Sequence, residues 1–343
     1  MSKNLQQIKT EAVDYAADCT DAFTTLRSAS FWKENQIEFS AGPDNSPFRM
    51  NGNMNDWAFN QLCFRMNVPA GWVGNPKNCP EELKIKILND LAHDYRDDAN
   101  LMMRLKGNVV RAVLSSKYAQ FDNLGFIDLI AEAVSTMGIE PEIHRSVIGD
   151  DMKAYVVFPQ VTIAQDPDIQ HTRYPGNGGL HPSLYLSNSE RGGGSARVVG
   201  AVYRSICSNG VIFGWQEQSS FELRHVFHSR AAMGLLVAEG ITEGLRMSEV
   251  AAKKFVEAQE IKVPQISLGG IVDGWAAKYG ITITAKENWL AAITNETIVN
   301  GRQNDARLFD VINAATYIAQ TREHAETELI ERMAGDILAH GHA

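Results

Sequence analysis

The sequence predicts an α+β fold: a largely antiparallel sheet with a crossing helix, flanked by helical N- and C-terminal parts. Two observations support this fold class. Between Leu101 and Phe158, β-prone runs come in pairs joined by tight turns, with one helical segment between the pairs. The stretches on either side show helical periodicity instead. We therefore divide the chain into residues 1–99, 100–215 and 216–343.

The first part reads as mostly helical. From Leu5 to Ser28, apolar residues recur at spacings of three and four, which predicts an amphipathic helix. A short strand is expected at Ile37–Ser40 and a second helix at Met54–Met66. A third helix is expected from Pro80 to Tyr95, because proline suits the first helical turn and the acids that follow suit the helix dipole.

The middle part carries the predicted sheet. Its expected elements are a hairpin of Leu101–Leu105 and Val109–Ser115 turning at Gly107-Asn108, a helix at Asn123–Met137, and strands at Glu142–Ile148, Met152–Phe158, Ser183–Ser189 and Ala196–Cys207. A long irregular segment, Gln160–Gly179, precedes the last two strands. Loops of this length inside a domain are commonly functional or disordered.

The last part is expected to be helical and divided by glycines. The predicted helices are Ser229–Glu239, Ile241–Glu260, Ser267–Lys278, Lys286–Thr294 and Asp305–His340. Part of this helical region is expected to serve self-association.

Composition sets limits on the function. The chain is 44% hydrophobic and 21% charged, and it holds no apolar run of the roughly 20 residues that span a bilayer. Its polar N-terminus does not resemble a signal peptide, so we expect a cytoplasmic protein without a membrane partner. The four cysteines form no CxxC pair, which favours reduced thiols. The net charge of −9 argues against a general nucleic-acid coat, although a local basic groove remains compatible with it.

The glycine loop from Arg191 to Ser195 is the first candidate for chemistry. Consecutive glycines can turn several backbone N–H groups toward one anion. A nucleotide-hydrolysing P-loop is excluded, because the sequence has neither the lysine nor the helix that such a motif requires. Two interpretations remain: a flexible hairpin tip that closes on a nucleic-acid backbone, or a plain mobile loop.

Cations and tyrosines in the middle part form the second candidate, a single-strand binding surface. Arginine and lysine can neutralise phosphates, and each aromatic ring that stacks on a base contributes about 1–3 kcal/mol. The candidate residues are Arg104, Lys106, Arg111, Lys117, Tyr118, Arg173, Tyr174, Arg191, Arg197, Tyr203 and Arg224. Alternation along a strand places Arg197 and Tyr203 on one face and Arg204 on the other. The alternative is an ordinary strand whose tyrosine is half-buried.

Acids and histidines provide the weaker candidates. His225 and His228 are three apart and could share a helical face, as metal ligands, as acid and base, or as part of a basic helix start facing phosphate. The pairs Asp150-Asp151 and Asp166-Asp168 could hold Mg²⁺, or could form ordinary turns. Neither GxSxG nor HExxH occurs, so a conventional hydrolase is not supported and no catalytic residue is assigned.

Two runs carry a family resemblance: VRAVLSSKYAQFDN at Val110–Asn123 and SLYLSNSERGGGSARVVGAVYRSICSNG at Ser183–Gly210. They resemble the phage/plasmid-like domain of unknown function found in prophages, plasmids and phage genomes. The matching positions are Arg111, Ala112, Leu114, Ser115, Tyr118, Asp122, Asn123, Ser187, Ser189, Glu190, Gly192, Gly194, Ser195, Cys207, Asn209 and Gly210. With FNQLCFRMNVPAGW upstream, the resemblance spans about Asn55 to Trp215. It implies a protein of phage or mobile-element origin but carries no settled biochemistry.

The order of elements is also similar to that of phage single-strand annealing proteins, the Red-beta/RecT superfamily. This resemblance implies a ring or filament that holds one DNA strand without catalysis. We therefore expect a non-catalytic, homo-oligomeric single-stranded DNA binding and annealing protein of recombination, in the host cytoplasm if phage-encoded. The alternatives are a protein-interaction factor in counter-defence and a metal-dependent phosphoryl enzyme. No cofactor is expected, with Mg²⁺ as the one candidate.

Overall fold

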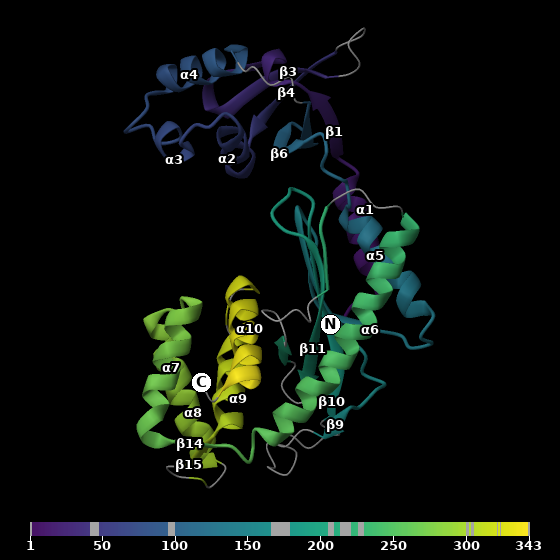
Figure 1. Ribbon diagram of the computed structural model, residues 1–343, viewed down its shortest axis with the longest axis vertical. Helices are drawn as coiled ribbons and strands as arrows, with labels where there is room; N and C mark the ends of the chain where they lie inside the picture. The colour runs from purple at the N-terminus through teal and green to yellow at the C-terminus, as the bar shows by residue number, and fades with distance from the viewer. Residues whose placement is uncertain are drawn as a thin grey trace.

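The computed structural model describes residues 2–41, 48–94, 100–165, 179–204, 209–212, 221–225, 230–299, 302, 305–320, 322 and 324–341. It shows an elongated α+β molecule with an N-terminal unit stacked above a central sheet and its helices (Figure 1). The predicted fold class is confirmed. Arg173, Tyr174, Asp166, Asp168 and His228 lie outside the described residues.

The N-terminal unit is built on a sheet with strand order β1-β5-β6-β4-β3-β2, here called the N-terminal sheet. Its strands are β1 (Cys19–Thr24), β2 (Ala29–Phe31), β3 (Gln36–Ala41), β4 (Phe48–Met54), β5 (Leu101–Lys106) and β6 (Val109–Ser115). The short 3-10 helices η1 (Leu26–Ser28) and η2 (Lys33–Asn35) link its outer strands. The helices are α2 (Asp56–Arg65), α3 (Ala70–Val73) and α4 (Glu81–Asp94). Phe59 and Leu62 of α2 and Leu88 of α4 pack with the sheet in one core.

The helix predicted from Leu5 to Ser28 is wrong in its second half. Helix α1 (Leu5–Ala16) begins at a capping box formed by Asn4 and Gln7, and the chain then becomes strand β1. The segment holds β-branched threonines, and it finds a hydrogen-bonding partner in β5, which lies far away in the sequence. Phe23, which the helical periodicity placed on a buried face, is 51% exposed.

The first hundred residues therefore combine their helices with strands β1, β2, β3 and β4 of one sheet. Strands β5 and β6, from the start of the middle part, pair with β1 and β4, so the division expected near residue 100 passes through one sheet. The hairpin at Gly107 is confirmed: the residue has a φ of +55° and joins β5 to β6. A β-bulge leaves Arg111 without a partner in the register, because Arg104 lies opposite Ala112 and Leu105 opposite Val110.

The second sheet, the central sheet, has strand order β12-β11-β10-β8-β7, with β13 beside β11 and β9 beside β10. Its strands are β7 (Glu142–Val147), β8 (Asp151–Val157), β9 (Ala164–Gln165), β10 (Gly179–Ser189), β11 (Ala196–Arg204), β12 (Asn209–Ile212) and β13 (Phe221–Leu223). All of these pairings are antiparallel. Together with α5 (Asn123–Ser135) they confirm an antiparallel sheet with a crossing helix, but the hairpin predicted at Leu101–Ser115 belongs to the N-terminal sheet and not to this one.

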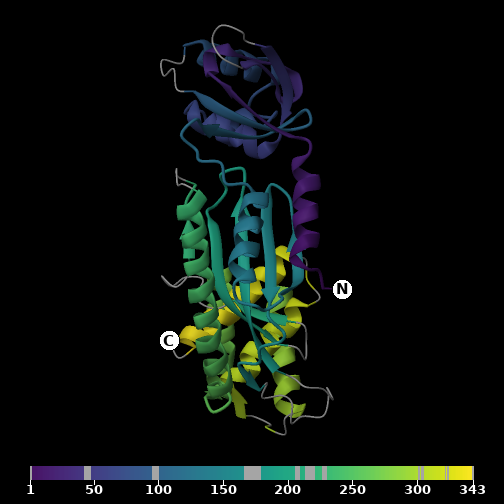
Figure 2. The ribbon, with the colours of Figure 1, turned by 90° about the vertical axis from the view of Figure 1, so that its right-hand side faces the viewer.

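Helices cover both faces of the central sheet (Figures 1 and 2). On one face α1, α5 and α6 (Arg230–Glu257) enclose an apolar core that includes Ile130, Val156 and Leu186. Helix α6 runs through Gly240, where the sequence suggested a break. It crosses β11 so closely that a Cβ on Gly200 would lie 2.4 Å from the Gly244 carbonyl oxygen.

The C-terminal helices lie on the other side of the sheet. They are α7 (Gln265–Tyr279), α8 (Ile283–Val299), α9 (Leu308–Ala319) and α10 (His324–His340), with the small strands β14 (Lys262–Pro264) and β15 (Asp305–Arg307) pairing at their base. The single helix predicted at Asp305–His340 is thus a strand and two helices. Phe255 at the end of α6 packs with Phe309 and Ile312 of α9, which joins the two parts in one core. Among the described residues, none of the helices has the length and apolarity to cross a bilayer.

Candidate nucleic-acid interface

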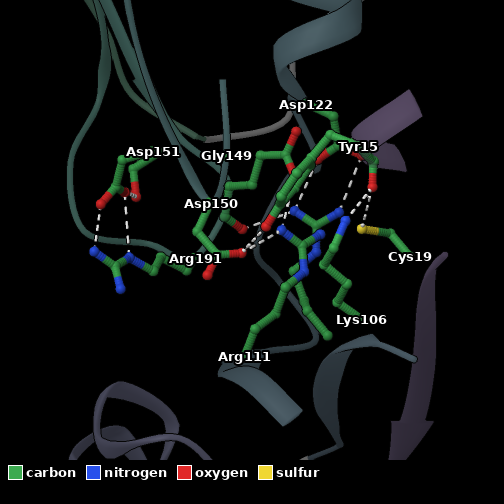
Figure 3. Close-up of polar contacts among 12 residues, drawn as sticks. Tyr15, Cys19, Lys106, Arg111, Asp122, Gly149, Asp150, Asp151 and Arg191 are labelled. Atoms are coloured by element: carbon green, nitrogen blue, oxygen red, sulfur yellow. Dashed lines mark hydrogen bonds and ion pairs between the residues drawn. The ribbon is translucent and has the colours of Figure 1, made fainter. Parts of the chain in front are cut away.

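A buried ion-pair network, here called the joint, connects the N-terminal unit to the central sheet (Figure 3). It consists of Asp21, Arg104, Arg111, Asp122, Asp150 and Glu190. Both arginines come from the N-terminal sheet and are only 1–2% exposed. The side chains of Asp150 and Glu190 stand at the edge of the central sheet, before β8 and after β10.

Arg104 is held at three places. Its Nε lies 2.9 Å from Asp21 Oδ1, and its Nη1 lies 2.8 Å from Asp122 Oδ1 and donates to the Glu190 carbonyl oxygen over 2.7 Å. Burial alone would lower the pKa of Arg104, but the hydrogen bonds to Asp122 and Asp21 outweigh it and hold the pKa above its usual value. Arg104 therefore stays charged and compensated inside the protein.

Arg111 makes the second half of the joint. Its Nη1 lies 2.9 Å from Asp150 Oδ1 and 2.7 Å from Glu190 Oε2. Glu190 Oε1 also accepts from the backbone N–H of Asn123, at the start of α5. Burial is the main cause that raises the pKa of Glu190, and its contacts with Arg111 and the Asn123 N–H oppose it. Asp150 in turn accepts from the Tyr15 hydroxyl at 2.7 Å, which ties α1 to the joint.

The glycine loop lies next to the joint and is anchored on both sides. The indole N–H of Trp57 and the amide N–H of Gln61 donate to the Arg191 carbonyl oxygen at 3.1 and 2.8 Å. The Gly193 N–H donates to Ser189 Oγ at 2.9 Å. The Arg191 side chain pairs with Asp151 and lies 4.6 Å from the centre of the Trp57 ring; Figure 3 shows this pair beside the joint. The loop is thus held by α2 and β10.

Two pockets flank the glycine loop. The first, the aromatic pocket, has a volume of about 580 Å³ and lies between α2 and the end of β6. Its lining includes Trp57, Gln61, Phe64, Arg65, Lys117 and Tyr118. Phe64 is 87% exposed, although it is a large apolar ring. The Tyr118 hydroxyl lies 2.7 Å from His225 Nδ1 and 3.1 Å from the Ser189 carbonyl oxygen, which fixes the wall of the pocket nearest the loop.

The second pocket, the polar pocket, has a volume of about 380 Å³ and lies on the other side of the loop. Its lining includes Trp57, Asp151, Lys153, Tyr185, Ser187, Arg191, Gly194, Arg197 and Glu328. Three cationic side chains therefore meet two carboxylates in one small space. Trp57 lines both pockets, so the two are neighbours around the loop, and together they form what we call the groove.

The structure divides the residues predicted for binding into three groups. Lys117 and Tyr118 line the aromatic pocket, and Arg191 and Arg197 line the polar pocket. Arg104 and Arg111 lie inside the joint, where both are ion-paired with carboxylates and only 1–2% exposed, so neither presents a guanidinium to a phosphate at the surface.

The remaining candidates are scattered. Lys106 is partly buried, with its ammonium 3.6 Å from the Tyr15 ring centre. Tyr203 is 6% exposed and packs against His144 and His181. It shares a face with Val199 and Ala201, as the alternation predicted. Arg224 is exposed, at the end of β13.

The sequence interpretation missed the contribution of α2. Trp57, Gln61 and Phe64 follow one another at spacings of four and three, so they share one helical face. The signal available in the sequence was this helical face, because it carries two aromatic rings and an amide that the hydrophobic core does not need. The partners of the buried arginines were also missed, because Asp21 and Glu190 lie far from Arg104 in the sequence.

The metal interpretation of the acids finds no support in the described ranges. Asp150 is bound to Arg111 and Tyr15, and Asp151 to Arg191 and Ser189. Among the residues that the structure describes, no three His, Cys, Asp or Glu side chains are grouped to hold a metal ion.

Comparison with known families gives a match that covers the two runs that carry the resemblance in the sequence. The model of a family described as "Domain of unknown function (DUF932)" matches residues 110–265, less than half of the chain. This range begins one residue before Arg111 and extends through the glycine loop, α6 and β14 to the first residue of α7, but it leaves out α2. Neither a curated protein nor a solved structure gives a significant match. The matched region thus resembles a family whose function is unknown.

Proposed function

We propose that the groove binds single-stranded DNA without catalysis. The observation that carries this proposal is the aromatic pocket, in which an 87% exposed Phe64 lies beside Lys117 and Arg65. A ring that is left in water costs free energy unless a partner covers it. Unpaired bases offer flat faces for such a ring, and each stacked base contributes about 1–3 kcal/mol.

Charges in the groove suit the phosphates that accompany those bases. Lys117 is exposed at the rim of the aromatic pocket, and Arg197 lines the polar pocket. The net charge of −9 does not oppose this arrangement, because the potential near a surface depends on the local charges. A strand entering at Phe64 would pass around the glycine loop and reach the polar pocket. The anchored loop would then separate two successive nucleotides.

The joint has a positioning role in this proposal. Arg104 and Arg111 fix Glu190, which directly precedes Arg191 and the glycine loop. We therefore leave both arginines out of the DNA-contacting set and keep Lys117, Tyr118, Arg191 and Arg197, to which α2 adds Trp57 and Phe64. Arg224 lines neither pocket, and its contact with DNA stays a prediction.

Strand annealing, assembly into a homo-oligomeric ring or filament, and a place in phage or mobile-element recombination are further parts of the proposal. They rest on the resemblances seen in the sequence. They predict that the protein speeds pairing of complementary strands, and that its mass in solution rises when a single strand is added.

Fluorescence anisotropy of a labelled thymidine 20-mer, compared with its duplex over a salt series, tests the proposal. Phe64→Ala should weaken single-strand binding by about 1–3 kcal/mol, because one stacked base is lost. Lys117→Ala should reduce the slope of log K against log salt by about 0.7, because one phosphate contact is lost. Unfolding curves of each variant check that the fold is retained.

Matched controls are available elsewhere on the surface. Phe23→Ala removes a ring that is 51% exposed on β1, and Lys253→Ala removes an 80% exposed lysine of α6; both should bind like the wild type. Absence of binding at about 50 mM salt, where phosphate contacts are strong, would overturn the proposal. That result would direct attention to a protein partner at the same exposed pocket.

A further inference from the structure

Glu328 of α10 reaches into the polar pocket from the C-terminal helices. Its carboxylate pairs with Lys153 of β8 and lies 3.5 Å from Arg332, one helical turn further along α10. The Glu328 side chain is 9% exposed, whereas that of Lys153 is 33% exposed. The acid is thus the more enclosed partner, and the lysine borders the open space of the pocket.

Tyr185 of β10 lines the same pocket, and burial together with the negative charge of Glu328 raises the pKa of its hydroxyl. The hydroxyl therefore keeps its proton at physiological pH and is a hydrogen-bond donor. An ammonium from β8 and a guanidinium from α10 thus hold the Glu328 carboxylate, and a phenol from β10 lies in the same pocket. Such a set of donors would serve a phosphate oxygen equally well.

We propose that this set of donors is a phosphate subsite of the groove, and that Glu328 is a built-in competitor that the DNA backbone displaces. The inference rests on the proposed function, because it assigns one phosphate of the bound strand to Lys153 and Tyr185. It also means that α10 lowers the affinity for DNA, because its Glu328 occupies the subsite.

Displacement requires only a side-chain movement, because other contacts hold α10 in place. Glu331, one residue before Arg332, bonds Arg145 of β7 through both carboxylate oxygens, at 2.6 and 2.7 Å. Near the other end of the helix, Asp336 accepts from Lys278 and Tyr279 of α7. When Glu328 swings away, the polar pocket retains Lys153, Arg191 and Arg197 against the single carboxylate of Asp151.

Glu328→Gln tests the inference with an isosteric change. The variant should bind the labelled thymidine 20-mer about tenfold more tightly at low salt, because one charge-assisted contact becomes available to the DNA. The salt slope should steepen by about 0.7, which corresponds to one additional phosphate contact. Glu328→Asp, which shortens the side chain but keeps its charge, should give a smaller gain.

Glu326→Gln is the matched control. Glu326 lies on the same helix, pairs with Arg322 at 3.5 Å and stays outside the polar pocket. Its substitution changes the net charge of the protein by the same amount but should leave affinity unchanged. Adding Lys153→Met to Glu328→Gln should cancel the gain, because the freed ammonium is then absent.

The outcomes separate this inference from the proposed function. If Phe64→Ala weakens binding but Glu328→Gln does not raise the affinity for the 20-mer, Glu328 is not a competitor, and the proposal that the groove binds DNA stands. The same conclusion follows if Glu326→Gln raises the affinity equally, or if the higher affinity of Glu328→Gln persists when Lys153→Met is added. If neither the wild type nor Glu328→Gln binds the 20-mer, the proposed function fails, and the phosphate subsite fails with it.

Discussion

The joint and the groove use the same kinds of side chain for opposite purposes. In the joint, Arg104 and Arg111 are 1–2% exposed and meet carboxylates from both units. In the groove, Arg191 and Arg197 also pair with acids, yet they line a pocket that is open to solvent. Burial of the cation decides the difference, because a ligand cannot reach a guanidinium that is 1–2% exposed, and removing its carboxylate would leave that charge in a poorly solvating interior. An arginine in a sequence motif can therefore mark a structural joint as readily as a binding site.

Arg111→Met gives the strongest test of this comparison. It leaves the buried Glu190 and the partly exposed Asp150 without their cation, so the free energy of unfolding should fall by about 3–5 kcal/mol. Urea unfolding at neutral pH measures the change. Arg224→Met removes an exposed arginine and should cost less than about 0.5 kcal/mol. If Arg111→Met kept its stability and lost only affinity for DNA, Arg111 would be a binding residue and not a structural one.

Gly192→Ala should have an intermediate effect, because Gly192 lies where the joint meets the groove. Its φ is +74°, and an added Cβ would lie 2.7 Å from Leu114 Cδ2. Left-handed backbone at a residue with a side chain costs about 1–3 kcal/mol. At Gly194 a Cβ would meet open space, so Gly194→Ala is the matched control and should unfold at nearly the wild-type urea concentration. If both variants lost the same free energy of unfolding, the left-handed backbone at Gly192 would not be the cause of the destabilisation.

The pH dependence of stability should give the smallest effect. Burial lowers the pKa of His225, and likewise that of His144, below the usual value of about 6.5. At a pH between the lowered pKa of the folded state and the usual pKa of the unfolded state, these rings are therefore neutral in the folded protein and protonated in the unfolded chain. The stability they contribute is present above pH 6.5 and is lost as the pH falls through the folded value, by at most about 1.4 kcal/mol per pH unit for each group.

His225→Phe isolates one of these contributions, since a flat ring can still stack on Tyr118. Unfolding free energies measured between pH 5.5 and 7.5 should show a shallower slope for this variant than for the wild type. If the slope of unfolding free energy against pH were the same as in the wild type, His225 would take up protons equally in the folded and unfolded states. The ring would then be accessible to water in the folded protein.

Local patterns predicted several elements of both sheets. The turn at Gly107-Asn108, the helix beginning at Asn123 and the alternation that groups Val199 with Tyr203 were all visible in the sequence, because each depends on neighbours in the chain. Strand β1 was not visible. Its apolar residues fit a helical period by coincidence, and only pairing with β5 selects the extended conformation.

The sequence indicated part of the candidate groove. Lys117, Tyr118, Arg191 and Arg197, which were predicted to bind DNA, border it, and their role in binding stays a prediction. Burial of Arg104 and Arg111 could not be predicted, because it depends on Asp21, on Glu190 and on the packing of two units. The role proposed for Glu328 depends on the packing of α10 against the central sheet. No local pattern in the sequence indicates that packing.

The position of Glu190 also bears on how the chain can fold during synthesis. The N-terminal sheet cannot close until β6 has been made, and its buried Arg111 then waits for the Glu190 carboxylate, which follows β10. Until the ribosome has released that glutamate, Arg111 lies partly uncompensated on the surface that later becomes internal, whereas Arg104 already has Asp21 as a partner. That unit is therefore expected to stay loosely structured on the ribosome and to become stable together with the central sheet, in one late cooperative step.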